Sequence, residues 1–284
     1  MPGSGKLLTG DLEAAAHRVT AALGDPRRVG VAFSGGVDSS VLLALAVRAL
    51  GPGRTLAILG VSPSLAADER TAAHTVAAVI GAPIVEIETR EGDNPAYRAN
   101  GPDRCFHCKD ELFTRISDEV AGQYGLTAIA YGENADDTLR PDRPGSRAAT
   151  NHRVLRPLAD AGIDKAAVRA LARAFELPCA DKPAAPCLAS RIPHFDEVTP
   201  EKLHQIDAAE SALRALGFID SRVRHHGDVA RIELPADDLP RAAVADVRGQ
   251  IHRAVRAAGF RFVTLDLGGI QSGAFTLPLV AARA

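Results

Sequence analysis

Two cysteines, Cys105 and Cys108, form a Cys-x-x-Cys pair in a polar stretch of the chain, between Arg104 and Lys109. Neighbouring cations stabilise the thiolate, which is the form of cysteine that binds metals and attacks electrophiles. A redox pair is expected to open a helix after a strand, whereas this pair closes a segment that we predict to be an irregular loop. A zinc site would need two further ligands, and an iron–sulfur site at least one further thiolate.

Cys187 is the candidate for that further thiolate. It lies in a second polar loop that contains prolines, between Lys182 and Arg191. If the two loops fold against each other, Cys187 can complete a site with the Cys-x-x-Cys pair; otherwise the cysteines act separately. The fourth cysteine, Cys179, lies where we predict the start of a strand, and we interpret it as a buried apolar residue.

A glycine-rich turn near the start of the chain has the residue types of a phosphate-binding site. The apolar run 29–33 is followed by Ser34-Gly35-Gly36-Val37-Asp38-Ser39-Ser40, and a helical pattern continues to residue 50. Backbone N–H groups at a helix start bind anions. Gly35 and Gly36 can adopt positive φ angles, and Ser39 and Ser40 can cap the helix. Asp38 would repel phosphates unless it holds Mg²⁺. The spacing excludes a Walker loop.

The apolar patterns predict a doubly wound parallel sheet of the α/β class in the first part of the chain. Helices are expected at 11–23, 41–50, 66–80, 110–123 and 164–176, and strands at 28–33, 55–61, 83–87 and 127–131. Ligands of such sheets bind at the carboxyl ends of the strands. That edge would carry the glycine-rich turn, Ser62 after the second strand, and Asn134 and Asp137 after the fourth. The stretch 140–153, rich in Pro, Arg and Gly, is expected to be a loop.

The pattern changes after Pro193 to the order α-β-β-α-β. Thr199 and Pro200 have the residue types of a helix N-cap and first turn, and this helix is predicted to end at residue 216. Two strands, 218–224 and 229–234, would be separated by His225-His226-Gly227-Asp228, and a helix at 239–257 and a strand at 262–267 would follow. We therefore predict two domains, residues 1–193 and a smaller α+β domain of residues 194–284.

Composition narrows the functional classes. The chain has 284 residues, 46% of them apolar and 24% charged, which is ordinary for a globular protein. The net charge of −2 provides no global field that would attract nucleic acid or a membrane surface. No run approaches the roughly 20 apolar residues of a membrane span, and four cysteines in this length do not suggest a disulfide scaffold. We expect a cytoplasmic protein.

Six segments together resemble one family, LarE, which belongs to the PP-loop ATP pyrophosphatases (adenine nucleotide alpha-hydrolase-like fold). Ser34–Ser39 matches the superfamily signature SGGxDS. The more specific matches are Arg104-Cys105-Phe106-His107-Cys108-Lys109, Asn134-Ala135-Asp136-Asp137, the run Cys187-Leu188-Ala189-Ser190-Arg191-Ile192-Pro193, Val223–Glu233, and Val263–Leu267. The resemblance extends from about residue 12 to 276.

The resemblance implies an ATP-dependent sulfur transferase of nickel-pincer cofactor biosynthesis, which serves lactate racemase. ATP with Mg²⁺ would adenylate a carboxylate of pyridinium-3,5-biscarboxylate mononucleotide, release pyrophosphate and allow sulfur to enter as a thiocarboxylate. Members with one cysteine sacrifice its sulfur, whereas members with three hold a [4Fe–4S] cluster. Cys105, Cys108 and Cys187 therefore resemble the cluster type. Asp38 would hold Mg²⁺, and the nucleotide would contact residues 34–40, Ser62, Asn134 and Asp137.

Several side chains can bind the anionic substrate, because guanidinium groups bind phosphate and carboxylate bidentately. The candidates are Ser190, Arg191, Arg222 and Arg224. Glu210 and Glu233 are interpreted as surface or salt-bridge residues rather than metal ligands. The expected partners are a small nucleotide substrate, a sulfide source and further copies of this chain, with no nucleic acid and no membrane.

Three alternatives remain open from the sequence. The first is the sacrificial-cysteine version of the same reaction. The second is another PP-loop adenylating enzyme, either an amide ligase or a tRNA thiolase; a tRNA enzyme would usually show a basic patch or an RNA-binding module. The third is an ATP-binding sensor without chemistry, which would give the polar cysteines no role.

Overall fold

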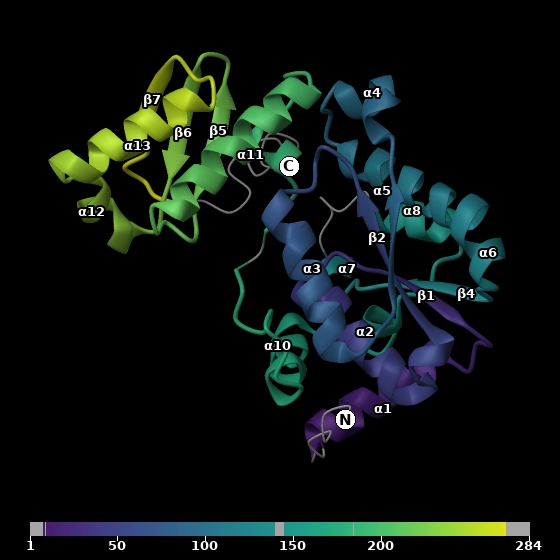
Figure 1. The fold of residues 1–284 in the computed structure, drawn as a ribbon. Helices are drawn as coiled ribbons and strands as arrows, with labels where there is room; N and C mark the ends of the chain where they lie inside the picture. Colours follow the sequence, from purple (N-terminus) through teal and green to yellow (C-terminus); the bar gives the residue numbers. More distant parts are fainter. Residues whose placement is uncertain (1–7, 9, 140–144, 184, 271–284) are drawn as a thin grey trace. The chain divides into compact units, whose positions relative to one another are not determined.

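The computed structural model describes residues 8, 10–139, 145–183 and 185–270 (Figure 1). The chain divides into two compact units whose segments alternate along the sequence. Unit 1 consists of residues 1–62, 69–91 and 105–185, and unit 2 of residues 63–68, 92–104 and 186–284. Two short segments that follow strands of unit 1 therefore belong to unit 2.

Unit 1 is built on a four-stranded parallel sheet with the order β3-β2-β1-β4. Its strands are β1 (Val29–Ala32), β2 (Thr55–Val61), β3 (Ile84–Glu88) and β4 (Ala128–Tyr131). They are short runs rich in apolar and β-branched residues, and parallel strands require crossover connections, which helices provide. The prediction of an α/β doubly wound sheet is confirmed.

Helices cover both faces of this sheet (Figure 1). One layer contains α2 (Val37–Leu50), which packs on β1 and β2, together with α1 (Asp11–Leu23) and α10 (Lys165–Ala174), which contact α2. The other crossover and covering helices are α3 (Ala67–Ile80), α5 (Arg104–Arg115), the π-helix η3 (Ile116–Ala121), α6 (Gly122–Tyr124) and α8 (Gly145–Asn151). The short elements are η1 (Pro52–Arg54), η2 (Glu91–Asp93), α4 (Pro95–Arg98), α7 (Ala135–Thr138), α9 (Pro157–Asp160) and η4 (Leu188–Arg191).

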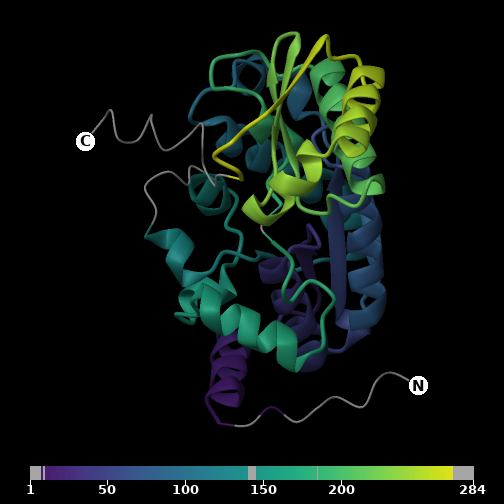
Figure 2. The same ribbon diagram turned by 90° about the vertical axis from the view of Figure 1, so that its left-hand side faces the viewer.

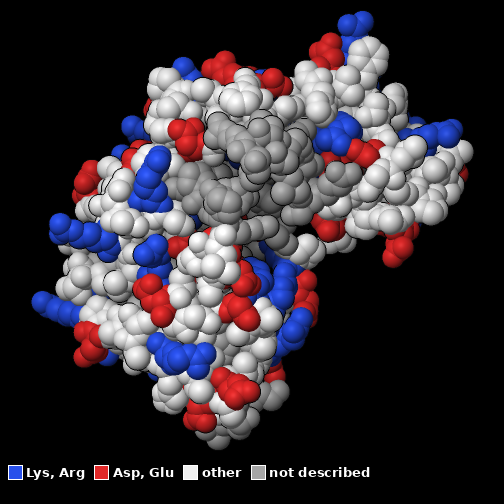
Figure 3. Space-filling view, turned by 180° about the vertical axis from the view of Figure 1, so that it is seen from behind, with Lys and Arg blue, Asp and Glu red and all other residues white. Residues whose placement is uncertain are grey.

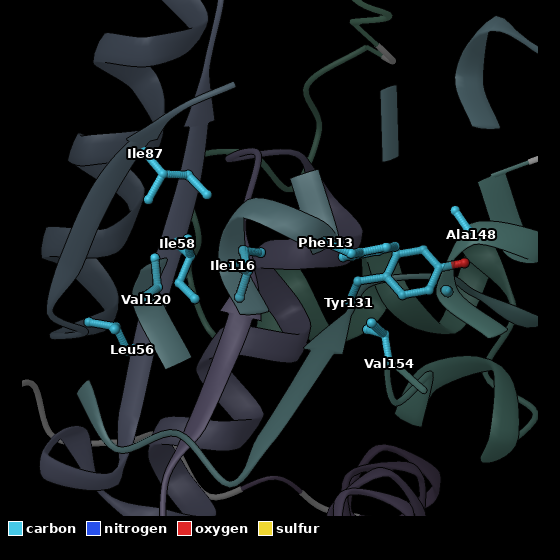
Figure 4. Packing of buried hydrophobic residues seen from close by; sticks show 10 residues of the cluster. Leu56, Ile58, Ile87, Phe113, Ile116, Val120, Tyr131, Ala148 and Val154 are labelled. Carbon is cyan, nitrogen blue, oxygen red and sulfur yellow. The ribbon is translucent and has the colours of Figure 1, made fainter. Parts of the chain in front are cut away.

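The apolar core between the sheet and the α5 side is compact (Figure 4). Leu56 and Ile58 of β2 belong to one buried cluster with Ile116, and the ring of Phe113 meets that of Tyr131 edge to face, with centroids 5.7 Å apart. Each fully buried side chain of this size contributes about 1.5–3 kcal/mol. The core therefore holds α5, and with it the Cys-x-x-Cys pair, against the sheet.

Unit 2 contains a three-stranded sheet with the order β5-β6-β7. Strands β5 (Arg222–His226) and β6 (Val229–Glu233) are antiparallel, and β7 (Phe262–Leu265) runs parallel to β6. Helices α11 (Pro200–Ala215) and α13 (Ala245–Ala257) lie on one face of this sheet (Figure 2). The short helices are α12 (Leu239–Ala243) and η5 (Ala236–Asp238). Thr199 caps α11 with Pro200 in the first turn, as predicted.

The structure corrects the expected loop around the Cys-x-x-Cys pair. Helix α5 begins at Arg104 rather than at residue 110, so that Cys105 and Cys108 lie in its first turns. The segment contains the weak helix formers Cys, Phe and His, although Asp103 directly before it is a residue type that favours a helix N-cap. Packing decides instead, because Phe106 of this segment lies against the apolar core of unit 1.

Four further expectations differ from the structure. Residues 177–180 form turns and not a strand, because Pro178 lacks the N–H that a strand would donate. Residues 145–151 are helical rather than a loop, and residues 140–144 lie outside the described part. His225 and His226 belong to β5, because Gly227 with φ 60° permits a two-residue turn. The helix at 239–257 is interrupted at Val244, which has an extended conformation.

None of the helices in the described part of the chain combines the length and apolar character needed to cross a bilayer.

Candidate functional site

The glycine-rich turn joins β1 to α2 at the carboxyl edge of the sheet, as the sequence predicts. Gly35 has a φ angle of 73°, and a Cβ atom there would lie 2.8 Å from the Cα atom of Ala73. Both facts require glycine. Gly36 is different: its φ angle is −71° and it is the N-cap residue of α2. The expectation of positive φ angles therefore holds for Gly35 alone.

The serines of the turn stabilise the turn itself rather than capping α2. Ser39 Oγ donates to Gly36 O over 3.1 Å and accepts from the backbone N of Ser34 over 3.3 Å. Ser34 Oγ lies 3.3 Å from Ser39 Oγ and 3.4 Å from the N of Gly36. Ser40 is fully buried, and its Oγ has no hydrogen-bond partner among the described residues. The expected serine caps are thus wrong, and Gly36 itself has no side chain with which to cap the first N–H groups of α2.

Asp38 is at the centre of a polar network at this edge. Its Oδ2 lies 2.5 Å from Lys165 Nζ, and its Oδ1 accepts from Asn134 Nδ2 over 3.0 Å. Asn134 Nδ2 also donates to Asp137 Oδ2 over 3.0 Å. The structure therefore brings together three of the predicted residues, Asp38, Asn134 and Asp137.

Lys165 is the member of this network that sequence reasoning missed. It is the first residue of α10, directly after the N-cap Asp164, and its backbone N donates to Asp136 Oδ2 over 2.9 Å. In sequence, only its place after an N-cap residue distinguishes it. An ammonium group beside this turn supplies the cation that a phosphate-binding site with a carboxylate requires.

The turn and its network fit a nucleotide bound with Mg²⁺. Asp38 and Asp137 offer hard oxygen ligands, the start of α2 offers backbone N–H groups, and Lys165 offers a positive charge. The loop after β4 also lies very close to the start of α2. A Cβ atom at Gly132, which follows β4, would lie 2.6 Å from the N of Ser39. Gly132 therefore lets the loop after β4 approach the glycine-rich turn.

Replacing Gly132 with alanine is expected to push the β4 loop away from the start of α2. The overlap is with backbone atoms, so the cost should be about 1–3 kcal/mol of stability, and ATP binding should weaken markedly. Isothermal calorimetry with ATP and Mg²⁺ measures the effect. Gly53→Ala is the matched control, because a Cβ atom there has nothing within 4 Å. Equal ATP affinity in both variants would contradict the close approach.

Ser62 lies at the end of β2, on the edge where it was predicted. Its Oγ donates to Glu91 Oε1 over 2.5 Å. Glu91 is buried, and its Oε2 has no hydrogen-bond partner among the described residues. Sequence reasoning missed Glu91, because a charged residue after a strand is usually exposed.

All four cysteines are free thiols. Cys105 and Cys187 are exposed, Cys108 is half-buried, and Cys179 is buried as expected. Cys105 and Cys108 belong to unit 1, whereas Cys187 belongs to unit 2, where it is the N-cap residue of η4. Within the described residues, no set of three or more His, Cys, Asp or Glu side chains is gathered as a metal site.

The cations that flank the cysteines in sequence are bonded elsewhere. Arg104 is buried and donates to Asn100 Oδ1 over 2.5 Å and to Ala189 O over 2.9 Å. Lys109 Nζ lies 4.4 Å from the centre of the Tyr131 ring. Lys182 Nζ donates to a Glu69 oxygen over 2.7 Å. The Cys-x-x-Cys pair itself lies in the first turns of α5, where the helix N-terminus provides a positive potential.

Unit 2 buries a cluster of arginines with carboxylates. Arg191 forms a two-bond pair with Glu210, at 2.8 and 3.1 Å. Arg224 donates to Glu233 over 2.8 Å and to the carbonyl of Ser190 over 3.0 Å. Glu210 and Glu233 therefore form salt bridges in this structure, in agreement with the interpretation from sequence.

Arg222 is the arginine of this cluster that best fits an incoming anion. It is buried, and its pKa is lowered by that burial and by the positive charges of Arg191 and Arg224. The largest cause is burial, and the two neighbouring guanidinium groups add repulsion between like charges. A phosphate or carboxylate group would relieve it, so Arg222, Arg224, Arg191 and the Ser190 segment together fit an anionic substrate.

Charges on the outer surface are mixed. On the face shown in Figure 3, blue Lys and Arg side chains alternate with red Asp and Glu side chains among the described residues. Recognition of long nucleic acids relies on clustered positive charge. The mixed charges on this face and the net charge of −2 therefore give no support to a tRNA substrate.

Comparison with known proteins connects these features to a family. The sequence profile of the asparagine synthase family matches residues 12–127, which contain the glycine-rich turn. Pyridinium-3,5-bisthiocarboxylic acid mononucleotide synthase from Lactiplantibacillus plantarum is 35% identical over 265 residues, which cover 93% of this chain and 95% of that protein. An uncharacterized Synechocystis protein is 39% identical over 92% of this chain and 97% of its own length.

A third relative, an uncharacterized protein of Methanocaldococcus jannaschii, is 28% identical over 85% of this chain and 90% of its own length. The match to the synthase extends over both units, so it covers the glycine-rich turn, the cysteines and the arginine cluster together. The chain therefore belongs to the LarE family of ATP-dependent PP-loop enzymes.

Proposed function

We propose that this enzyme uses ATP to convert a carboxylate of pyridinium-3,5-biscarboxylate mononucleotide into a thiocarboxylate, a step toward the nickel-pincer nucleotide of lactate racemase. The observation that carries the proposal is the full-length match to the bisthiocarboxylic acid mononucleotide synthase. It is supported by a phosphate-binding turn with an acidic residue in unit 1 and by a buried arginine cluster in unit 2.

In the proposed first step, unit 1 binds ATP at residues 34–40. The start of α2 and Lys165 bind the phosphates, while Asp38 and Asp137 hold Mg²⁺, which offsets charge as the α–β bond breaks. The substrate carboxylate oxygen attacks the α-phosphorus, pyrophosphate leaves, and an acyl adenylate forms. Lys165 now pairs with Asp38 and can turn to the phosphates when Mg²⁺ takes its place. Asn134 borders this site through its bond to Asp38, and Ser62, which follows β2 at the same edge of the sheet, is proposed to contact the nucleotide as well.

In the second step a sulfur nucleophile attacks the acyl carbon, a thiocarboxylate forms and AMP leaves with the bonding electron pair. Arg222 and Arg224 bind the anionic groups of the substrate. Arg191 is already paired with Glu210. It also donates to the Ser190 hydroxyl over 2.9 Å and so helps to order the segment that contains Ser190.

We propose that the sulfur is delivered by the cluster route, with Cys105, Cys108 and Cys187 as ligands of one [4Fe–4S] cluster. Free thiols with exposed or half-exposed side chains support this assignment. Arg104 also supports it, because it immediately precedes Cys105 in the chain and bonds to Ala189, two residues after Cys187. When bound, such a cluster supplies an iron without a protein ligand, where an additional sulfide can bind.

Pyrophosphate release tests the proposal. The enzyme with ATP and Mg²⁺ should release pyrophosphate only when pyridinium-3,5-biscarboxylate mononucleotide is present, and mass spectrometry should detect a thiocarboxylate after sulfide is supplied. A nucleotide sensor would release none, and an amide ligase would require an amine. Release that depends on tRNA instead of the mononucleotide would overturn the assignment.

Replacement of Arg222 with glutamine should raise the KM for the mononucleotide about 10- to 100-fold, because one charge-assisted bond to an anion is lost. ATP binding should not change, since residues 34–40 belong to unit 1. Steady-state pyrophosphate assays measure both constants. The exposed Arg248→Gln on α13 is the control. An unchanged KM in Arg222→Gln would remove this residue from the substrate site.

A further inference from the structure

The loop that carries Cys187 and Arg191 has little regular structure of its own. This cysteine loop, residues 186–198, contains one short 3-10 helix, Leu188–Arg191, and otherwise consists of turns and irregular backbone. Buried carbonyl groups in such a segment need hydrogen-bond donors from other parts of the chain. Two buried side chains from the segment 92–104 provide them.

Asn100 is the first of these side chains, and it is fully buried. Its Nδ2 donates to the cysteine loop at 3.3, 2.7 and 3.0 Å. The acceptors are the carbonyl oxygens of Ile192, Pro193 and Asp196. The backbone carbonyl oxygen of Asn100 accepts from the N of Phe195 over 3.2 Å and lies 3.0 Å from His194 Nδ1. A single residue thus binds the second half of the loop through both its side chain and its backbone.

Arg104 is the second side chain, and it bonds to Asn100 and to the first half of the loop. Its Nη1 donates to Asn100 Oδ1 over 2.5 Å and to Ala189 O over 2.9 Å. The guanidinium group has only donors, so it fixes the amide of Asn100 with oxygen toward Arg104 and nitrogen toward the loop. Arg104 and Asn100 therefore act as one unit.

The backbone of Asn100 restricts the residue further. Its φ angle is 55°, in the left-handed region where glycine and asparagine are favoured. Glycine would supply this angle but no donor, and aspartate would present an acceptor to three carbonyl groups. Asparagine meets both requirements.

The opposite side of the cysteine loop meets the arginine cluster. Arg224 donates to Ser190 O over 3.0 Å, and Arg191 donates to Pro186 O over 2.8 Å. The N of Leu188 donates to Ser64 O over 3.0 Å. Backbone and side-chain bonds from two directions therefore determine the loop's conformation on both sides of Cys187.

We propose that Asn100 and Arg104 are positioning residues, which hold the cysteine loop so that Cys187 and the anion-binding arginines keep one geometry during sulfur transfer. Reactions of this kind lose rate steeply when a reacting group is displaced by about 1 Å. The kinetic consequence rests on the proposed function, whereas the conformational consequence does not.

Asn100→Asp is the direct test, because it keeps the size of the side chain but replaces the donating Nδ2 group with an oxygen that only accepts. Alkylation of Cys187 by iodoacetamide in the full-length protein, followed by peptide mass spectrometry, should change in rate about tenfold or more. The KM for the mononucleotide should rise while the dissociation constant of ATP stays the same. Asn151→Asp, at an exposed position on α8, is the matched control. A purely structural role would lower Tm, ATP binding and substrate use together.

Hydrogen exchange on the wild-type protein keeps the proposal testable if Asn100→Asp does not fold. Amides of residues 192 and 194–198 should be protected although they lack regular structure. Arg104→Lys should increase their exchange about tenfold, because the flexible lysine ammonium group does not reproduce the rigid planar position from which Nη1 of Arg104 makes both of its bonds. Arg253→Lys is the exposed control. Unprotected amides in the wild type, or unchanged Cys187 alkylation in Asn100→Asp, would overturn the proposal. Failure of the mononucleotide as a substrate would instead overturn the proposed function and leave these two readouts valid.

Discussion

Asp38→Asn should abolish pyrophosphate release while the fold survives. Asparagine keeps the size of the side chain and can still accept from Lys165, which lies 2.5 Å from the carboxylate in the wild type. It loses the charge with which Asp38 would hold Mg²⁺. We expect the rate to fall by about 10³ or more, because metal-assisted charge stabilisation supplies several kcal/mol to phosphoryl chemistry. Pyrophosphate release with saturating ATP and mononucleotide measures the loss.

The control for this variant is Asp25→Asn. Asp25 is also a carboxylate paired with a cation, Arg54 at 2.8 Å, but it is exposed and precedes β1, whereas the glycine-rich turn follows that strand. An exposed pair of this kind contributes about 0–1 kcal/mol, so activity and Tm should hardly change. Circular dichroism would confirm that both variants fold. Wild-type turnover in Asp38→Asn would refute the role of Asp38 in the reaction.

Cys105→Ala should remove iron and repeated turnover together. Under the cluster route the variant loses one of three thiolate ligands, and metal affinity falls steeply when a ligand is removed from a minimal set. Iron and acid-labile sulfide are measured after anaerobic purification, and turnover is measured with sulfide supplied. The polypeptide mass of the wild type should be the same before and after the reaction.

Cys179→Ala is the matched control, because Cys179 is a buried thiol that belongs to no proposed site. It should keep its iron and its activity. Under the sacrificial route, Cys105→Ala would instead behave like the wild type, and Cys187 would become dehydroalanine with the loss of one H₂S per chain. Full activity of Cys105→Ala, or dehydroalanine at residue 187, would exclude the cluster route.

The sequence by itself determined the sheet, the glycine-rich turn and the edge at which its polar residues gather. Alternating apolar strands and helices have periods of two and about 3.6 residues, which are visible along one dimension. The turn is also encoded by neighbouring residues in sequence, because the φ angle of 73° at Gly35 is one that glycine adopts readily. Strand ends of a parallel sheet meet at one edge, so the positions of Asp38, Asn134 and Asp137 along the chain are enough to place them together.

Only the tertiary structure decided which side chains bond to these residues. Lys165 and Asp38 are separated by 127 positions, and no local pattern connects them. Helix α5 begins at Arg104 because Phe106 packs against the core, which outweighs weak helix propensity. Segment 92–104 joins unit 2 for the same kind of reason: Asn100 satisfies carbonyl groups more than 90 residues away in sequence. Buried polar groups take partners from wherever the fold brings donors, and sequence distance carries no information about that choice.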